Sequence, residues 1–171
     1  MRSVIDGDGS LAVSRTIFEK IYADYNKRAY VSPDPLQFLY NYDDPRDREV
    51  VGLIASSLAY GRVAQILKSV DRVLACLGPA PSEYLRRVNR QELETKLAGF
   101  VHRFTDSSDM VGFLCCIGNV LNTYGSVENL FLSHFKGDTW EAMRGFTEDF
   151  LDCGGSGTNF LMPDPSKGSA C

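Results

Sequence analysis

Short helices with clear beginnings and ends are the feature that most restricts how this chain folds. Asp34-Pro35 and Asp44-Pro45 each place a capping carboxylate before a proline, the preferred order at a helix start. Gly78-Pro79 and Gly125 stand where helical apolar spacing stops. Between these signals the apolar residues recur at helical spacing, and no alternating runs with hairpin turns recur. We therefore predict an all-α fold of about eight helices with short connections.

The expected helices follow one another along nearly the whole chain. They span residues 14–25, 35–40, 45–59, 63–77, 81–88, 91–97, 110–124, 126–135 and 138–151. The run 110–126 carries no charge, but its glycines and asparagines favour a helix buried in the domain over a membrane span. The expected organisation is a disordered tail over 1–13 and a helical domain over 14–153. A Gly-rich loop and the start of a hairpin motif are expected over 154–171.

Composition narrows the classes of function. A chain of 171 residues, 44% hydrophobic and 23% charged, is globular in composition. Its net charge of -4 excludes a polycation that coats nucleic acid or an anionic membrane, but it is compatible with a local basic face. Five cysteines without a CxxC pair favour buried, reduced thiols in a cytoplasmic protein. We expect no cofactor, no metal and no membrane partner, and His102 and His134 are predicted to be surface or capping residues.

One helix end carries residues suited to nucleic acid. Tyr60, Gly61 and Arg62 follow the apolar helix expected over 45–59. A tyrosine stacks on a base, a glycine permits close backbone approach, and an arginine neutralises a phosphate. The same residues also fit a plain helix terminus with an aromatic ring packed beneath it. The sequence leaves both interpretations open.

Two further segments carry weaker signals. The charge-dense run 43–49 is interpreted chiefly as a solvated helix start with local ion pairs, the alternative being Arg46 or Arg48 on a phosphate. Near the chain end, Lys167-Gly168-Ser169 follows two prolines, and a lysine beside free backbone N–H groups suits an anion. The alternative for this second segment is a disordered end.

Four segments together resemble a known family. They are residues 25–36, 44–63, 102–105 and 162–171, which read YNKRAYVSPDPL, DPRDREVVGLIASSLAYGRV, HRFT and MPDPSKGSAC. They resemble the bacterial family called domain of unknown function twenty-four hundred, over nearly the whole chain from Ser14 onward. That family has no established activity, so the resemblance alone implies no reaction.

The family in turn resembles, at the level of the fold, the helix-hairpin-helix DNA glycosylases. In those enzymes a Gly-rich hairpin binds the DNA backbone and an aspartate performs the chemistry. The likeness implies that residues 166–170 are a degenerate hairpin turn and that the helix end at 54–62 meets the duplex. The hairpin glycines are incomplete here, and the chain stops before a segment resembling the catalytic Asp-Thr-His region. No catalytic residue is therefore assigned.

These observations lead to two alternative functions. The first is a nucleic-acid-binding, DNA glycosylase-like domain that contacts DNA or RNA through Tyr60, Gly61, Arg62 and Lys167-Gly168-Ser169. The second is a non-catalytic helical module for protein interaction or regulation. Because a segment beyond Cys171 is expected to cover part of the domain, an exposed apolar groove near the chain end and self-association through it are expected as well.

Overall fold

The computed structural model describes residues 15–153 and 161–163, and the chain divides into two units between Ser32 and Pro33. The first unit contains α1 (Arg15–Tyr25) and the 3₁₀ helix η1 (Arg28–Tyr30). The apolar spacing predicted a helix over residues 14–25, and α1 confirms it. Neither helix has a buried residue, so the apolar side chains of α1 are exposed.

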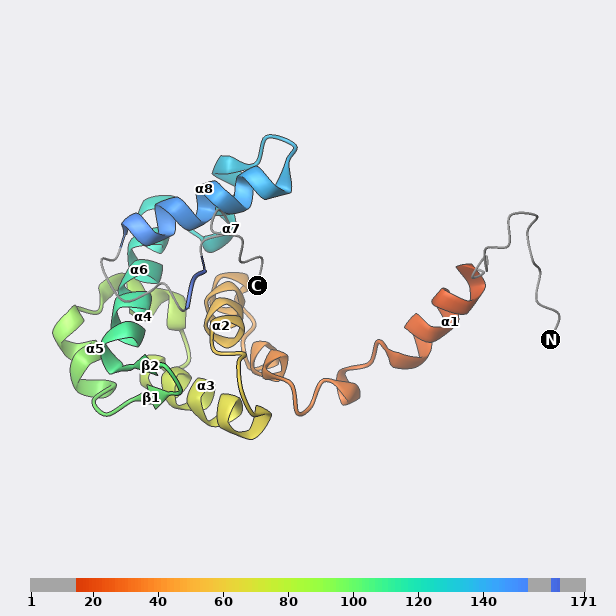
Figure 1. The fold of residues 1–171 in the computed structure, drawn as a ribbon, viewed down its shortest axis with the longest axis horizontal. Coiled ribbons are helices and arrows are strands. Elements are labelled where there is room, and N and C mark those ends of the chain that lie inside the picture. Colours follow the sequence, from red (N-terminus) through yellow and green to blue (C-terminus); the bar gives the residue numbers. More distant parts are fainter. Residues whose placement is uncertain (1–14, 154–160, 164–171) are drawn as a thin grey trace. The chain divides into compact units, whose positions relative to one another are not determined.

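The second unit is built almost entirely from helices, which confirms the predicted all-α fold (Figure 1). Its elements are η2 (Pro35–Asn41), α2 (Pro45–Ser57), α3 (Val63–Leu77), α4 (Pro81–Arg87), α5 (Arg90–Lys96), β1 (Val101–His102), β2 (Thr105–Asp106), α6 (Ser107–Tyr124), α7 (Val127–His134) and α8 (Thr139–Asp152). The strands β1 and β2 pair as a short antiparallel hairpin, the one sheet among the described residues. The sequence had not indicated this hairpin.

The predicted helix boundaries lie within three residues of those in the structure, because the capping residues act locally. Asp34 and Asp44 accept hydrogen bonds from backbone N–H groups in the first turns of η2 and α2, each at 2.8 Å. Asp106 begins α6 with a capping box, in which side chains and backbone N–H groups pair reciprocally. Gly78 and Gly125 follow α3 and α6 with φ of +77° and +85°, conformations that favour glycine.

Two carboxylates of α2 cap other helices. Asp47 accepts a hydrogen bond from the backbone N–H of Ser82, at 2.8 Å, in the first turn of α4. Glu49 accepts from the N–H groups of Val127, at 2.8 Å, and Glu128, at 3.1 Å, at the start of α7. Asp47 is only 7% exposed, so part of the charge-dense run 43–49 lies inside the fold and orients α4 and α7 against α2.

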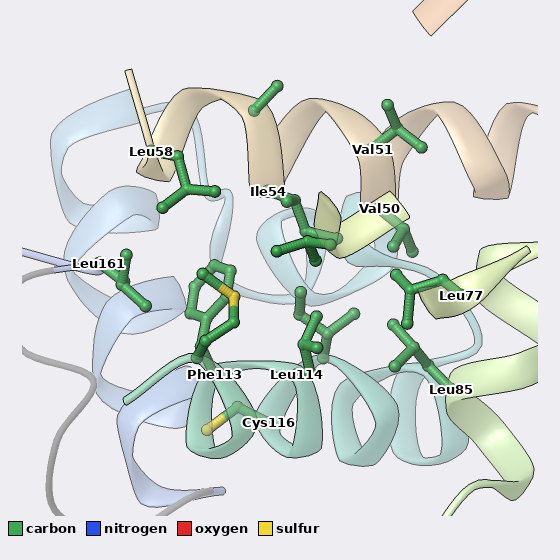
Figure 2. Close-up of a cluster of buried hydrophobic side chains, with 14 of the residues drawn as sticks. Val50, Val51, Ile54, Leu58, Leu77, Leu85, Phe113, Leu114, Cys116 and Leu161 are labelled. Carbon is green, nitrogen blue, oxygen red and sulfur yellow. The ribbon is translucent and has the colours of Figure 1, made fainter. Parts of the chain in front are cut away.

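The helix α6 lies at the centre of the core, and ten of its 18 residues are buried. Figure 2 shows Ile54 of α2 and Leu58, the residue after this helix, facing Phe113 and Leu114 of α6, with Leu161 beside them. The prediction that the uncharged run is a buried helix is thus confirmed. Within the described ranges, no single helix is long and apolar enough to cross a membrane; α6 and α7 reach that length and composition only as a pair bent by 68°.

A close contact between backbones sets the position of α4 on α6. A Cβ atom placed on Gly118 would lie 2.5 Å from the carbonyl oxygen of Leu85, which leaves no room for a side chain. Next in the chain, the Arg86 guanidinium donates to the carbonyl oxygens of Leu121 and Gly125 at the C-terminal end of α6. Gly118 therefore permits the close approach of α4 and α6. Arg86 supplies hydrogen bonds to carbonyl oxygens at the C-terminal end of α6, which have no partner within the helix.

The substitution Gly118→Ala should lower the free energy of unfolding by about 1 to 3 kcal/mol, because the added methyl group overlaps a backbone carbonyl that cannot easily move. The control is Gly52→Ala in the interior of α2, where the added Cβ would meet its nearest atom, Leu39 Cδ2, at an ordinary 3.6 Å. Helix propensity favours this alanine by about 1 kcal/mol, so its stability should hold or rise. Urea unfolding followed by circular dichroism measures both, and equal losses would contradict the prediction.

Candidate functional site

The connection between α2 and α3 lies against the β1–β2 hairpin. This connection contains Tyr60 and Gly61, and it ends at Arg62, the N-cap residue of α3. In the hairpin Val101 pairs with Asp106 and His102 with Thr105, leaving a two-residue turn. β1 packs on α3, so two segments about forty residues apart in the sequence form one surface (Figure 1).

Reciprocal hydrogen bonds join Tyr60 and His102. The Tyr60 hydroxyl donates to the backbone oxygen of His102, and His102 Nε2 donates to the backbone oxygen of Tyr60, each at 3.1 Å. Because the single tyrosine proton goes to the carbonyl, Thr105 Oγ1 is the donor in its 2.6 Å contact with the Tyr60 hydroxyl. The two rings meet edge to face with centroids 4.7 Å apart. Half-buried Tyr60 is therefore part of the joint between the connection and the hairpin.

His102 is held inside this joint as a neutral imidazole. It is 1% exposed, and its Nε2 must carry the proton because a carbonyl oxygen can only accept. Its Nδ1 then accepts from the Ser69 hydroxyl at 2.9 Å. Burial lowers the pKa of His102, and the positive charge of Arg103 lowers it further, while hydrogen bonds to the Tyr60 and Leu58 backbones oppose this shift.

The prediction that His102 is a surface or capping residue is therefore wrong. The residue is buried, and both ring nitrogens have partners. Those partners lie 33 and 42 residues away in the sequence, so no local pattern around His102 could indicate its burial.

Gly61 makes room for an arginine of the hairpin. Its φ is +109°, and a Cβ placed on it would lie 2.9 Å from Cδ and 3.1 Å from Nη1 of Arg103. Arg103 itself has φ of +54°, and its guanidinium carbon lies 5.5 Å from the ring centroid of Phe104. Arg62, next in the chain to Gly61, is exposed. In the described part of the chain neither arginine forms a salt bridge, so two unneutralised cations lie on one surface.

The structure adds two residues to those that the sequence predicted. Arg103 and Phe104 form the hairpin turn and are exposed, with Phe104 67% exposed. Their signal in the sequence was the segment HRFT, quoted only for its resemblance to a family. The predicted second contact at Lys167-Gly168-Ser169 lies outside the described residues.

A second polar cluster joins the ends of α6, α7 and α8. The Tyr124 hydroxyl, at 2.7 Å, and His134 Nε2, at 2.8 Å, both contact the same carboxylate oxygen of Asp149. The hydrogen bond from Tyr124 and then that from His134 lower the pKa of Asp149, and the carboxylate in turn raises the pKa of Tyr124. The ring of His134 packs directly over Gly145. Hydrogen bonds to the Asp149 carboxylate of α8 therefore connect this helix to Tyr124 of α6 and His134 of α7.

An apolar groove of about 690 Å³ lies between η2, α2, α7 and α8. Its lining is mainly aliphatic and aromatic, with charged groups from α2 and α7: Leu39, Pro45, Arg48, Glu49, Gly52, Leu53, Ser56, Val127, Glu128, Phe131 and Phe146. The groove that the sequence predicts was placed near the chain end, and residues 164–171 lie outside the described part of the chain.

The described residues contain no group of three or more His, Cys, Asp or Glu side chains that could hold a metal ion. Burial raises the pKa of the Cys116 thiol to about 12, so this thiol is protonated at neutral pH and is a packing residue rather than a nucleophile.

Comparison with known families identifies the region that carries this site. Residues 34–171 match the model of the family described as protein of unknown function (DUF2400). The chain belongs to this family. The DUF2400 region begins just after the boundary between the two units, so α1 lies outside it, whereas the Tyr60 connection and the hairpin lie within it. No curated protein and no solved structure matches the chain.

The buried imidazole of this DUF2400 domain predicts a dependence of stability on pH. Because the pKa of folded His102 lies below its ordinary value of about 6.5, the unfolded chain binds the proton first as the pH falls. The free energy of unfolding should therefore decrease as the pH drops below about 6.5, until the pH passes the lowered pKa of the folded state. Urea unfolding at several pH values between about 7.5 and 5.5 measures this decrease.

Two variants separate the contribution of His102 from that of the other histidine. His102→Gln should be less stable at neutral pH, and its stability should change less over the same interval. His134→Gln leaves the buried imidazole in place and should keep the decrease. An unchanged slope in His102→Gln would contradict the assignment.

Proposed function

We propose that the surface formed by the Tyr60 connection and the β1–β2 hairpin binds nucleic acid, as part of a DNA glycosylase-like domain. The supporting observation is the gathering of Arg62 and Arg103 beside Gly61, in a chain whose net charge is -4. Neither arginine forms a salt bridge in the described part of the chain, so a phosphate would not have to compete with a carboxylate for either guanidinium group. This is the local basic face that an acidic protein needs in order to bind a polyanion.

Each residue of the surface has a separate role in this proposal. Arg62 and Arg103 neutralise phosphates, and such contacts position the nucleic acid without reading its sequence. Gly61 makes room for the Arg103 side chain, which occupies the space where a Cβ atom would lie. Tyr60 acts as a positioning residue, because its hydroxyl hydrogen bonds hold the hairpin and hence Arg103 in place. Lys167-Gly168-Ser169 is proposed as a second anion contact.

Binding is proposed without an assigned catalytic residue. Base excision requires a carboxylate or an activated water next to a flipped nucleoside. Asp47 and Glu49 are engaged at the starts of other helices, and Asp149 accepts hydrogen bonds from Tyr124 and His134. The glycosylase-like part of the proposal therefore concerns the mode of DNA binding and not the reaction.

The alternative function, a non-catalytic module for protein interaction or regulation, is supported by the apolar groove between α2 and α7. Such a groove fits the apolar face of an amphipathic helix from a partner protein. The groove is lined by η2, α2, α7 and α8, whereas the proposed nucleic-acid surface comes from the α2–α3 connection and the hairpin. Substitutions at the two places therefore test the two functions separately.

Arg62→Ala should weaken the binding of oligonucleotides of any sequence, because it removes a phosphate contact. The slope of log affinity against log salt should flatten by about 0.7 for single strands and about 0.9 for duplexes. Fluorescence anisotropy at two salt concentrations measures both quantities. The control, Arg87→Ala on α4, removes an equal charge that is paired with Glu83. Equal losses in both variants would indicate a general charge effect, and an intact protein without salt-sensitive binding would refute the proposal.

Tyr60→Phe tests whether Tyr60 positions the hairpin or stacks on a base. The change keeps the ring and removes the hydroxyl group, which bonds to His102 and Thr105. A positioning role predicts a loss of about 1 kcal/mol or more in the free energy of unfolding and weaker oligonucleotide binding. A stacking role predicts unchanged binding, because the aromatic face remains. Thermal unfolding and anisotropy on the same variant distinguish the two.

A further inference from the structure

We infer that Ser69 is a positioning residue of the proposed nucleic-acid surface, because its hydroxyl group selects the tautomer of His102 that holds Arg103 in place. The inference rests on the proposed function, and it adds to the surface a residue of α3 that lies inside the fold. Ser69 is 4% exposed, so it acts through His102 and does not touch the ligand.

The two ring nitrogens of His102 face partners of opposite kinds. Nε2 lies 3.1 Å from the backbone oxygen of Tyr60, which can only accept a hydrogen bond. Nδ1 lies 2.9 Å from the hydroxyl of Ser69. A neutral imidazole carries one ring proton, so with that proton on Nε2 the Nδ1 atom needs a donor. In the described part of the chain the Ser69 hydroxyl supplies that hydrogen bond, and it therefore favours the tautomer in which Nε2 binds Tyr60.

Without the hydroxyl group, neither tautomer of His102 would be favoured. The ring is 1% exposed, so Nδ1 without a donor would be a buried acceptor that lacks a hydrogen bond, which is unfavourable. With the proton on Nδ1 instead, the lone pair of Nε2 would face the Tyr60 oxygen at 3.1 Å, and that contact would become repulsive. Both forms weaken the attachment of β1 to the α2–α3 connection.

The contact between Ser69 and His102 also connects the two segments that carry the arginines. Arg62 is the N-cap residue of α3, and Ser69 lies about two turns further along the same helix. Arg103 directly follows His102, the last residue of β1, and β1 packs on α3 (Figure 1). Ser69 therefore fixes the position of Arg103 relative to Arg62, and a nucleic-acid backbone that contacts both arginines depends on that position.

Arg103 needs this attachment because its backbone conformation is unfavourable. Its φ is +54°, in the left-handed region that residues other than glycine seldom adopt. Such a conformation persists only where the surrounding structure holds it. If β1 were less firmly attached, Arg103 could relax to a negative φ, and its guanidinium group would leave its place against Gly61.

The first test measures the tautomer of His102 by nitrogen-15 NMR of the imidazole rings at neutral pH, with His134→Gln used to assign the two sets of signals. The intact protein should show a protonated Nε2 and an unprotonated Nδ1. Ser69→Ala should show a mixture of the two tautomers. The control is Thr147→Val on α8, which removes a hydroxyl group of similar burial, 3% exposed and bonded to the Met143 oxygen at 2.9 Å. This control should leave the His102 signals unchanged, and an unchanged tautomer in Ser69→Ala would overturn the inference.

The second test is a double-mutant cycle on the binding of a labelled oligothymidine and a duplex of matched length, measured by fluorescence anisotropy below the melting temperature of every variant. Ser69→Ala should weaken binding by about 2- to 10-fold. In a protein that already carries Arg103→Ala, the same change should alter affinity by less than about 2-fold, because the arginine that Ser69 positions is absent. Thr147→Val should alter affinity in neither case.

A second substitution keeps the test decisive if Ser69→Ala does not fold. Ser69→Cys keeps the size of the side chain and replaces the hydroxyl by a thiol, which is a weaker donor. It should shift the tautomer and the affinity in the same direction as Ser69→Ala and by a smaller amount. A thiol variant with the tautomer and affinity of the intact protein would contradict the role of the hydroxyl group.

The outcomes separate this inference from the proposed function. If the intact protein binds salt-sensitively and Arg62→Ala weakens that binding, but Ser69→Ala binds as the intact protein does, the inference alone is wrong. Equal losses from Ser69→Ala with and without Arg103 would show that Ser69 acts on the fold as a whole, and would also overturn it. If the intact protein binds no nucleic acid, both the inference and the proposed function fail.

Discussion

The helices of this domain are short, and their packing depends on hydrogen bonds that satisfy the end of one helix with a side chain from another. Asp47 and Glu49 of α2 accept from the first turns of α4 and α7, and Arg86 of α4 donates to the last carbonyls of α6. A buried helix end without such a partner is unfavourable, because its N–H and C=O groups have left water. These contacts therefore orient α4, α6 and α7 around α2, and the apolar core fills the space between them.

The same kind of contact builds the candidate site. Tyr60 and His102 each bind the backbone carbonyl of the other, so the α2–α3 connection and the hairpin behave as one piece. Both side chains are used for this joint, whereas Arg62, Arg103 and Phe104 are among the exposed residues beside it. A ligand at this surface therefore meets the exposed side chains and not the side chains that form the joint.

The helix boundaries were predictable because their signals are local. Asp44 before Pro45 and Gly125 after an apolar run act within one turn of the chain. The hairpin was not predictable, because strands of two residues show no alternation and its turn places Arg103 where a glycine would have been a signal. The buried position of His102 was missed because its partners are far away in the sequence.

The all-α class and the order of helices can thus be inferred from the amino-acid sequence, since caps and apolar spacing act between near neighbours. Membership in the DUF2400 family could also be recognised from its segments. The tertiary structure was needed to place Tyr60 in a joint and to bring Arg103 beside Gly61. The bonds of that joint connect residues 42 and 45 positions apart, and a single sequence contains no pattern that pairs residues at such distances.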